Sequence, residues 1–572
     1  MIGLNKIGLN QVQLNRLRLN APFPTCRKMA GGGGSSDGFP QLPGDVTRWH
    51  FGGLTNEMMA AMDDPRIEDA DHKGRFLSFK NFAWKEGSGI SDVYPGALVF
   101  DGVDDYGVCE NFPILTKEKG YTVVALRQWI TRGKGALGLV SNVKNWLNNG
   151  AFLLEYRNIQ ADHLNKPISF GAIGSENDLP HILTYQTSKS YNGVSITTGN
   201  FEGTDVLHVG KLAPINVGTC INAAIWELVF LDHDATEEEL TKIKDYFVKT
   251  YPWLFFDQAW TVTGKTNEDE DRATIANITG NGNNLVLSNF GFAEGSGYGL
   301  YAENYAGGRW VQSTDRADLT WTSYSVNITS VKVASTQLYY QSYPEQPSFT
   351  VPSYKIKVYG LKDGQTLSYK QVTSEGQQIY KISEDGIYTL PSFLFKANGD
   401  WYGFTLDKIQ ETCDITIEQI PEYEGYLVTD GVDDKIVSSV FGMGKDFTIV
   451  GDWKFIDNKK SGTGLVKGSS FYIYNTMIGL DLYINSGSVK NSLDGIKSIN
   501  AACSDGRAYD RNWNEILANT GNVVGSGGTL EVSSSGGKFD RIAFKNLAIY
   551  PRILSKDDCI KAYNYLQTLK AK

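Results

Sequence analysis

The chain has 572 residues, which exceeds the size at which one hydrophobic core stops growing, so a single domain is excluded and roughly three or four are expected. Hydrophobic residues make up 41% of the chain and charged residues 21%, which excludes a disordered polyelectrolyte. The net charge of −10 argues against a general nucleic-acid binder, because binding phosphates requires a basic surface. The 61 glycines and the abundant aromatic residues favour strands and turns over helices.

Residues 1–36 contain a repeat in which a Leu-Asn pair recurs every five residues, an interval that does not match a helix. An apolar residue followed by a turn-forming Asn favours short turns or an added strand. The range carries basic residues, no acidic residue and a glycine-rich end, so we predict a tethered docking arm rather than a frayed terminus. Its predicted contact residues are Leu4, Leu9, Leu14, Leu19, Arg16 and Arg18.

The beginning of the chain lacks the uninterrupted apolar segment of a signal peptide, and no span long enough for a membrane follows. We therefore expect neither general secretory export nor membrane insertion. The six cysteines are scattered without a CxxC pair, and the six histidines lack metal-binding spacing, so no zinc or redox site is predicted.

Two internal duplications organise the rest of the chain. In the first, residues 97–105 match residues 426–434 and share the string DGVDD, and the strands that follow also match. Both copies end in a strand and a capped helix, the first helix starting after Thr236 and the second after Ser555.

The second duplication pairs residues 74–89 with 282–297, each ending in a GSG turn, and predicts two small β connectors. Residues 299–422 are rich in tyrosine and alternate as strands, which predicts a further β-sandwich. The expected domain boundaries are 1–36, 37–95, 96–256, 257–298, 299–422 and 423–572.

The repeated DGVDD string, with its flanking strands and closing helix, resembles laminin-G-like domains of the concanavalin A-type jelly roll. The resemblance implies an all-β, multi-domain chain with two jelly-roll sandwiches, at 96–256 and 423–572. Members of this family bind glycans or proteins, sometimes with calcium, and a minority are glycosidases.

The residues of DGVDD favour a hairpin turn in which aspartate side chains accept hydrogen bonds from nearby backbone amides. The alternative is a calcium site built on Asp104 and Asp105, or on Asp433 and Asp434, but no further oxygen ligands are evident in the sequence. We therefore predict no metal and no other cofactor.

Sugar-stacking aromatic residues are expected where the two copies differ, and the candidates are Trp146, Tyr472 and Tyr474, with core packing as the alternative role. Asp414 and Glu418 are four positions apart in a predicted strand, but they alternate with apolar residues as on a solvated face. Without another catalytic constellation, the chain is predicted not to be an enzyme.

The basic arm, glycine tract and lectin-like domains are similar to those of bacteriophage tail or head appendage and fibre proteins. The prediction is a virion structural protein that attaches to host-surface glycans or decorates the particle. It would contact other virion proteins through residues 1–36, form a homo-oligomer and bind no nucleic acid. The alternatives are a bacterial cell-surface glycan-binding protein and a purely architectural virion component without a ligand.

Overall fold

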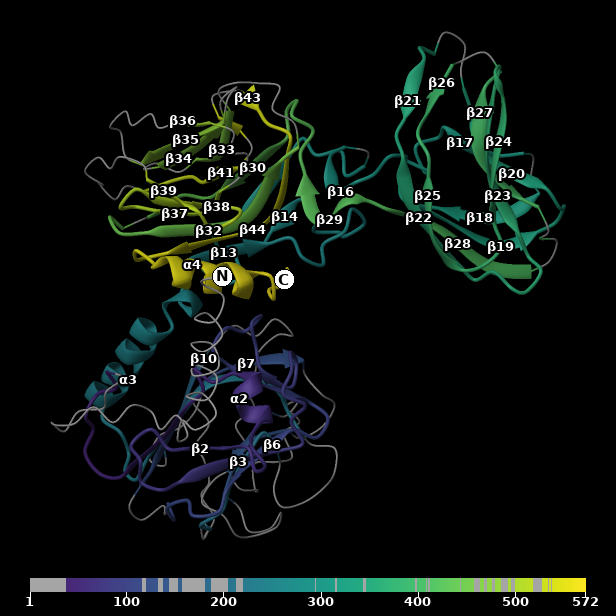
Figure 1. Ribbon diagram of the computed structural model, residues 1–572. Coiled ribbons are helices and arrows are strands. Elements are labelled where there is room, and N and C mark those ends of the chain that lie inside the picture. Colours follow the sequence, from purple (N-terminus) through teal and green to yellow (C-terminus); the bar gives the residue numbers. More distant parts are fainter. Residues whose placement is uncertain are drawn as a thin grey trace, which may run out of the picture.

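The computed structural model describes most of residues 38–571; the main gaps are 143–152, 157–180, 187–203, 212–219, 457–462, 485–491 and 518–526, with shorter breaks elsewhere. The described chain is built mainly of antiparallel sheets, which confirms the all-β, multi-domain prediction. They form three sandwiches, which we call module 1 (residues 38–256), module 2 (257–300 with 422–571) and the inserted sandwich (301–421) (Figure 1). Among the described residues, no helix has the length and apolar character needed to cross a membrane.

Module 1 consists of two six-stranded sheets that face each other. One contains, in spatial order, β10 (His181–Gln186), β7 (Thr122–Thr131), β12 (Asn222–Leu231), β5 (Leu98–Asp101) and β4 (Gly89–Ile90), with β1 (Val46–His50) paired to β12. The other contains β2 (Arg66–Glu68), β3 (Phe76–Lys80), β6 (Tyr106–Cys109), β11 (Leu207–Val209), β8 (Leu137–Ser141) and β9 (Leu153–Tyr156). Trp49, Phe79, Phe100 and Leu228 pack in the core between them.

Module 2 repeats this arrangement in two eight-stranded sheets. The first contains β16 (Gly297–Leu300), β29 (Glu422–Val428), β44 (Ile542–Tyr550), β32 (Thr448–Phe455), β37 (Ile499–Cys503), β38 (Arg507–Asp510) and β39 (Glu515–Leu517), with β13 (Gln258–Thr261) paired to β44. The second contains β14 (Thr274–Ile275), β15 (Leu285–Ser288), β30 (Lys435–Ser438), β41 (Glu531–Val532), β33 (Thr463–Lys467), β34 (Phe471–Asn475), β35 (Gly479–Ile484) and β36 (Ser492–Asp494). Three short two-stranded pairs complete the described strands, two of them in module 2: β31 (Phe441–Gly442) with β40 (Gly527–Gly528), and β42 (Ser534–Ser535) with β43 (Lys538–Phe539).

The strand registers make the two modules equivalent position by position. Trp49 of β1 lies opposite Leu228, and Trp260 of β13 lies opposite Leu547. The indole nitrogens of both tryptophans donate to a backbone carbonyl just before β3 or β15. The described strands of module 1 therefore have counterparts in module 2, which adds β38 and β39 to one sheet and β35 and β36 to the other.

The interpretation of residues 37–95 and 257–298 as separate connectors is wrong. Strand β3 pairs with β6, and β15 pairs with β30, so these ranges supply strands to the sheets of the modules. The reason is the hydrophobic effect. Leu77 and Leu285 alternate with more exposed residues and are fully buried in the module cores. A small separate connector would have no core of its own in which to bury them. The two sequence duplications are thus one duplication.

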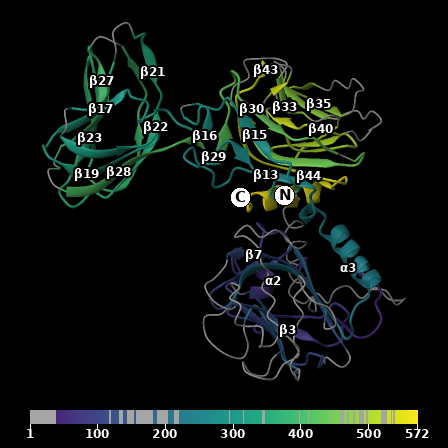
Figure 2. The ribbon, with the colours of Figure 1, turned by 180° about the vertical axis from the view of Figure 1, so that it is seen from behind.

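The third sandwich is inserted into a hairpin of module 2. In module 1 the strands β4 and β5 are joined by the short segment 91–97, whereas the equivalent strands β16 and β29 are separated by residues 301–421. Leu300 and Glu422 pair directly, so the chain leaves and re-enters module 2 at neighbouring positions. Figure 2 shows the same connection from behind.

The inserted sandwich has two five-stranded sheets and its own core, which includes Trp310, Tyr369 and Phe404. One sheet contains β17 (Trp310–Gln312), β20 (Thr336–Tyr340), β27 (Trp401–Leu406), β23 (Leu367–Thr373) and β24 (Gly376–Ile382). The other contains β18 (Ala317–Trp321), β19 (Ser325–Val331), β28 (Thr412–Ile420), β22 (Tyr354–Tyr359) and β25 (Gly386–Leu390), and a two-stranded ribbon pairs β21 (Phe349–Val351) with β26 (Phe393–Phe395). The predicted β-sandwich at 299–422 is therefore present, but as an insertion.

Each module ends in a capped helix, as the sequence predicts. Helix α3 (Glu237–Thr250) begins at Thr236 with a full capping box, and α4 (Lys556–Leu566) begins at Ser555, whose side chain accepts from the Asp558 backbone N–H. Module 1 also has the short helix α2 (Asn56–Ala60) and the 3-10 turn η2 (Pro252–Leu254).

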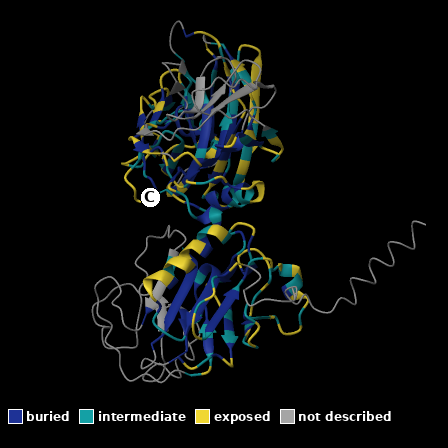
Figure 3. Ribbon diagram, turned by 90° about the vertical axis from the view of Figure 1, so that its left-hand side faces the viewer, coloured by how far each residue is buried: buried dark blue, intermediate teal, exposed yellow. Residues whose placement is uncertain are grey.

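A shared core joins the two modules, with α4 lying between them (Figure 1). The Tyr565 hydroxyl on α4 donates to the Gln128 side chain on β7 at 2.9 Å. Arg552 donates to the carbonyl of Val248 in the last turn of α3 at 3.1 Å. Figure 3 colours each residue by its burial and shows dark blue, buried strands inside both modules and yellow, exposed residues at their outside. The modules thus bury part of their surfaces against each other.

Candidate functional site

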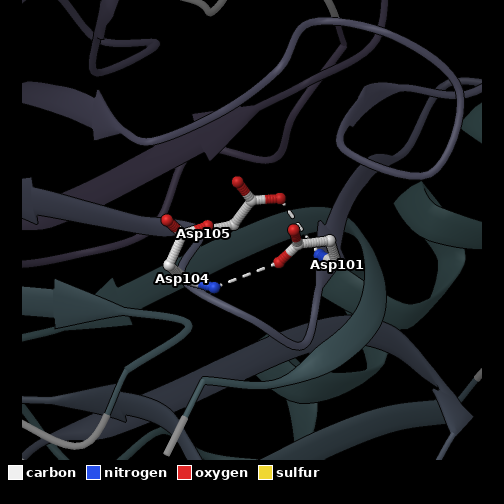
Figure 4. Close-up of side chains that lie close together, drawn as sticks. All are labelled: Asp101, Asp104 and Asp105. Carbon is white, nitrogen blue, oxygen red and sulfur yellow. Dashed lines mark hydrogen bonds between the residues drawn. The ribbon is translucent and has the colours of Figure 1, made fainter. Parts of the chain in front are cut away.

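The two DGVDD loops have the same geometry. In module 1, a carboxylate oxygen of Asp101 accepts from the backbone N–H groups of Val103 at 2.8 Å and Asp104 at 3.3 Å (Figure 4). The Asp105 carboxylate accepts from the Asp101 N–H at 3.0 Å and from the Ser88 hydroxyl at 3.1 Å. Gly102 has a φ of 81°, which only glycine adopts without strain at this turn.

Module 2 repeats these bonds. Asp430 accepts from the N–H groups of Val432 and Asp433, and Asp434 accepts from the Asp430 N–H at 2.7 Å and from the Ser296 hydroxyl. Because Ser88 and Ser296 come from the GSG turns, each hydrogen bond joins the two strings that the duplications share. The predicted positive φ of the glycine and the aspartate–amide hydrogen bonds are confirmed. The predicted hairpin is wrong, because β5 and β6, like β29 and β30, belong to different sheets, so each loop crosses from one sheet of its module to the other.

Burial raises the pKa of the inner aspartate in both loops. The pKa of Asp105 is raised to about 7 and that of Asp434 to about 6, because both carboxyl groups are removed from water. The Ser88 and Ser296 hydroxyls and the backbone N–H groups oppose this rise by stabilising the charged form. Each inner aspartate thus titrates closer to neutral pH than an exposed one.

The loops do not fit a calcium site as built. In each loop, one carboxylate oxygen from each of the three aspartates lies within 4.8 Å of the others, a spacing that a metal ion also requires. Calcium takes six to eight oxygen ligands, yet Asp101 and Asp105 direct carboxylate oxygens at backbone N–H donors. These carboxylates instead hold the connection between two strands.

Of the predicted sugar-stacking and docking residues, the structure describes the positions of Tyr472 and Tyr474. Trp146 and the whole docking arm, residues 1–36, lie outside the described residues. Tyr472 and Tyr474 lie on β34, opposite Tyr483 and Asp481 of β35.

Asp414 and Glu418 lie on β28 of the inserted sandwich. Asp414 is exposed and accepts from the Asn327 side chain at 3.0 Å. Four positions on a strand span about 13 Å, which exceeds the separation of paired acids in retaining and inverting glycosidases. This pair therefore lacks the spacing of a glycosidase acid pair.

The inserted sandwich contains a groove that sequence reasoning missed. It has a volume of about 400 Å³ and lies between the β23–β24 hairpin and the end of β26. Its lining residues include Gln371, Gln377 and Gln378, of which Gln371 is buried and donates to the Pro391 carbonyl at 3.1 Å. Phe393 and Leu394 of β26 also line it. Such a groove offers hydrogen-bonding groups and an apolar surface to the same ligand.

A buried carboxylate connects the β23–β24 turn to the segment after β26, which lie on either side of the groove. Asp400 is 4% exposed and accepts from the Ser374 N–H in the β23–β24 turn at 3.1 Å and from the Lys396 N–H after β26 at 2.8 Å. Lys396 also forms an ion pair with Glu375 across the rim. The string Glu375-Gly376-Gln377-Gln378, with two amides beside a tight turn, was the available sequence signal.

Comparisons with known proteins do not identify a family for the chain. No family model and no curated protein matches it. Among solved structures, Trypanosoma rangeli sialidase in complex with sialic acid is 10% identical, with a TM-score of 0.20 over 51% of this chain and 67% of the sialidase. The CBM22-1-CBM22-2 tandem domain of Paenibacillus barcinonensis Xyn10C is also 10% identical, with a TM-score of 0.15 over 45% of this chain and 98% of that domain. TM-scores of this size carry no argument about function.

Proposed function

We propose that this chain is a non-catalytic structural protein of a bacteriophage virion, an appendage or fibre component whose sandwiches attach to host-surface glycans. Residues 1–36 dock the chain to other virion proteins, modules 1 and 2 form the scaffold, and the inserted sandwich is displayed from it. The observation that carries the proposal is the insertion of a whole sandwich between the paired residues Leu300 and Glu422.

The scaffold role is supported by the contact between the modules. Tyr550 donates to the Trp253 carbonyl at 3.0 Å, and the Lys561 ammonium lies 4.1 Å from the Trp253 ring centroid. Buried apolar side chains of both modules surround these contacts. A pair of modules held in this way is a suitable base for a displayed binding domain.

The displayed role is supported by the way in which the inserted sandwich is attached. Its core is separate from the cores of the modules, and β16 and β29 join it to module 2. An insertion of this kind leaves the host fold intact because its two ends are neighbours. Binding therefore does not require the scaffold to rearrange.

Two measurements test the proposal, one on the intact chain and one on a truncated chain. Binding to polysaccharides from the host surface and to a glycan array should be detectable, without release of reducing sugar. Phage particles assembled with a chain that lacks residues 1–36 should lose the protein. Full occupancy of the truncated chain would rule out the docking arm, turnover of a polysaccharide would contradict the non-catalytic role, and binding to no glycan would favour the architectural alternative.

A further inference from the structure

We infer that a basic cluster on the outer face of module 2 binds an acidic sugar unit, one that carries a carboxylate or sulfate group. The cluster consists of the cations Lys454, Lys545 and Arg511 and the rings of Tyr423 and Tyr426. This inference rests on the proposed glycan-binding function and gives it a place on module 2 and a ligand class.

Two lysine ammonium groups of the cluster meet at one aromatic ring. The Lys454 ammonium on β32 lies 4.3 Å from the Tyr426 ring centroid, and the Lys545 ammonium on β44 lies 5.8 Å from the same centroid. The Lys454 ammonium also lies 5.8 Å from the Tyr423 ring centroid. These side chains meet because β29, β44 and β32 are neighbours in the first sheet of module 2 (Figure 1). The electron-rich faces of the rings hold the ammonium groups in place.

The positive charge of the cluster is not neutralised within the described part of the chain. No described residue forms an ion pair with Lys454, Lys545 or Arg511. Burial lowers the pKa of Lys454, and Arg511 and Lys545 lower it further against the opposing effect of Asp452. Like charges held close together repel one another, and an anion bound among them would remove that repulsion.

The acidic side chains that act on the cluster do not cancel its charge. Asp452 is 6% exposed, and its carboxylate accepts from the Tyr426 hydroxyl at 2.7 Å. It thereby fixes the ring on which the lysines rest, which lowers the ordering cost of binding. Burial and the exposed Glu422 raise the pKa of Tyr423, but two arginines oppose this rise.

Tyr423 is held in a strained backbone conformation beside the lysines. Its φ is 59°, in the left-handed region that residues other than glycine rarely adopt. Its ring packs edge-on against the Tyr426 ring, with centroids 6.4 Å apart, and stays partly exposed. Strain of this kind is concentrated at functional sites. Here it presents a flat apolar surface, next to the cations, to the C–H face of a sugar.

The same face of module 1 carries no such cluster. The strand registers and the shared DGVDD string give the equivalent positions: Tyr426, Asp452, Lys454 and Lys545 in module 2 correspond to Ala97, Leu126, Gln128 and Trp226 in module 1. Of the module 1 residues, the three apolar ones are buried in the core that the modules share, and Gln128 bonds to α4. The duplicated fold therefore does not require charges here, which supports a binding role for those of module 2.

The test measures binding of the intact chain to a galacturonic acid tetramer, a sulfated disaccharide and neutral maltotetraose by titration calorimetry. The parent is compared with Lys454→Gln/Lys545→Gln, which keeps long polar side chains but removes both ammonium groups. We expect the double variant to bind the acidic sugars at least about 10-fold more weakly, since it loses two charge-assisted hydrogen bonds. Binding by the parent should also weaken as salt is added, because ions screen exposed charges.

The matched control is Lys445→Gln/Lys556→Gln, which changes the net charge by the same amount. Both lysines are exposed and lie near Thr448, at the opposite end of β32 from Lys454. The control should bind as the parent does. Because Lys454 and Lys545 are partly exposed, their double variant should keep the parent Tm, and a thermal scan checks this.

Each other outcome overturns a different part of the inference. Unchanged affinity of the double variant for acidic sugars overturns the cluster as the site, and binding of the neutral sugar alone overturns the ligand class. Displacement of the tetramer by an equal concentration of inorganic sulfate overturns the role of the sugar. If the parent binds none of these sugars but binds host-surface polysaccharide, this inference fails alone. If it binds neither, the proposed function fails as well.

A second variant tests the strained tyrosine. Glycine adopts a φ of 59° without strain, so Tyr423→Gly should keep the parent Tm or exceed it. Its affinity for acidic sugars should nevertheless fall, because the ring is lost. Full affinity in this variant, or a Tm that falls with the affinity, would contradict the binding role of Tyr423.

Discussion

The guanidinium of Arg48 donates a 2.8 Å hydrogen bond to the carboxylate of Glu227, and both side chains are fully buried. The hydroxyl groups of Tyr246 and Tyr251 also bond to this pair. In module 2, the strand registers put Ala259 and Asn546 at the equivalent positions. The shared fold therefore does not require the ion pair.

Removing one partner of this pair should destabilise module 1. Arg48→Met leaves the Glu227 carboxylate buried without its cation, which costs about 3–5 kcal/mol of unfolding free energy. Arg48→Met/Glu227→Gln removes both charges and should recover most of this loss. Urea denaturation of the three proteins measures the effect, and a double variant as unstable as the single one would contradict the explanation.

The inner aspartate of the first loop should make stability depend on pH. Because the pKa of Asp105 is raised to about 7 in the folded chain, the folded state binds more protons than the unfolded state between about pH 4 and about pH 7. The unfolding free energy should therefore fall as the pH rises from about 4 to about 7. Denaturation at several pH values should show a flatter profile for Asp105→Asn and an unchanged profile for Asp104→Asn, whose aspartate is exposed. Parallel profiles for Asp105→Asn and the parent would refute the assignment.

Removal of metal ions should leave both modules folded. The carboxylates of Asp101 and Asp430 already accept hydrogen bonds from backbone amides, so the loops need no cation to close. Thermal unfolding with a chelator and with added calcium should give the same Tm. A Tm that drops on chelation and returns with calcium would show that the loops hold an ion.

Deletion of the inserted sandwich should leave module 2 intact. Leu300 and Glu422 face each other across β16 and β29, so a short glycine-rich turn can replace residues 301–421. We expect the shortened chain to keep the thermal transition of the modules, and the isolated range 301–421 to unfold cooperatively on its own core. Calorimetry on both proteins checks this, and an aggregated shortened chain would show that the insertion is needed for folding.

The sequence predicts local features of this fold well. The helix starts at Thr236 and Ser555 depend on side chains within three residues of each cap, and the DGVDD turns depend on aspartates within five. The duplication is also readable, because equivalent strands keep the same alternation of apolar residues.

The sequence does not predict which strands pair over long distances. Arg48 lies in a short strand where its charge suggests exposure, yet pairing of β1 with β12 places it beside Glu227, 179 positions away. The groove was missed for the same reason, because it also depends on contacts between distant parts of the chain. Gln378 and Phe393 line the same groove although β24 and β26 are not paired, and neither residue carries a pattern that indicates the other.

The attachment of the inserted sandwich determines how a pulling force enters the scaffold. A force on this sandwich draws β16 and β29 lengthwise in the same direction, because the chain leaves along one strand and returns along the other. The load then acts as shear between β29 and β44, which pair through Leu427–Phe544 and Val428–Ala543. Hydrogen bonds loaded in shear share the force instead of opening one after another. The connection is therefore arranged to resist tension that is applied through the inserted sandwich.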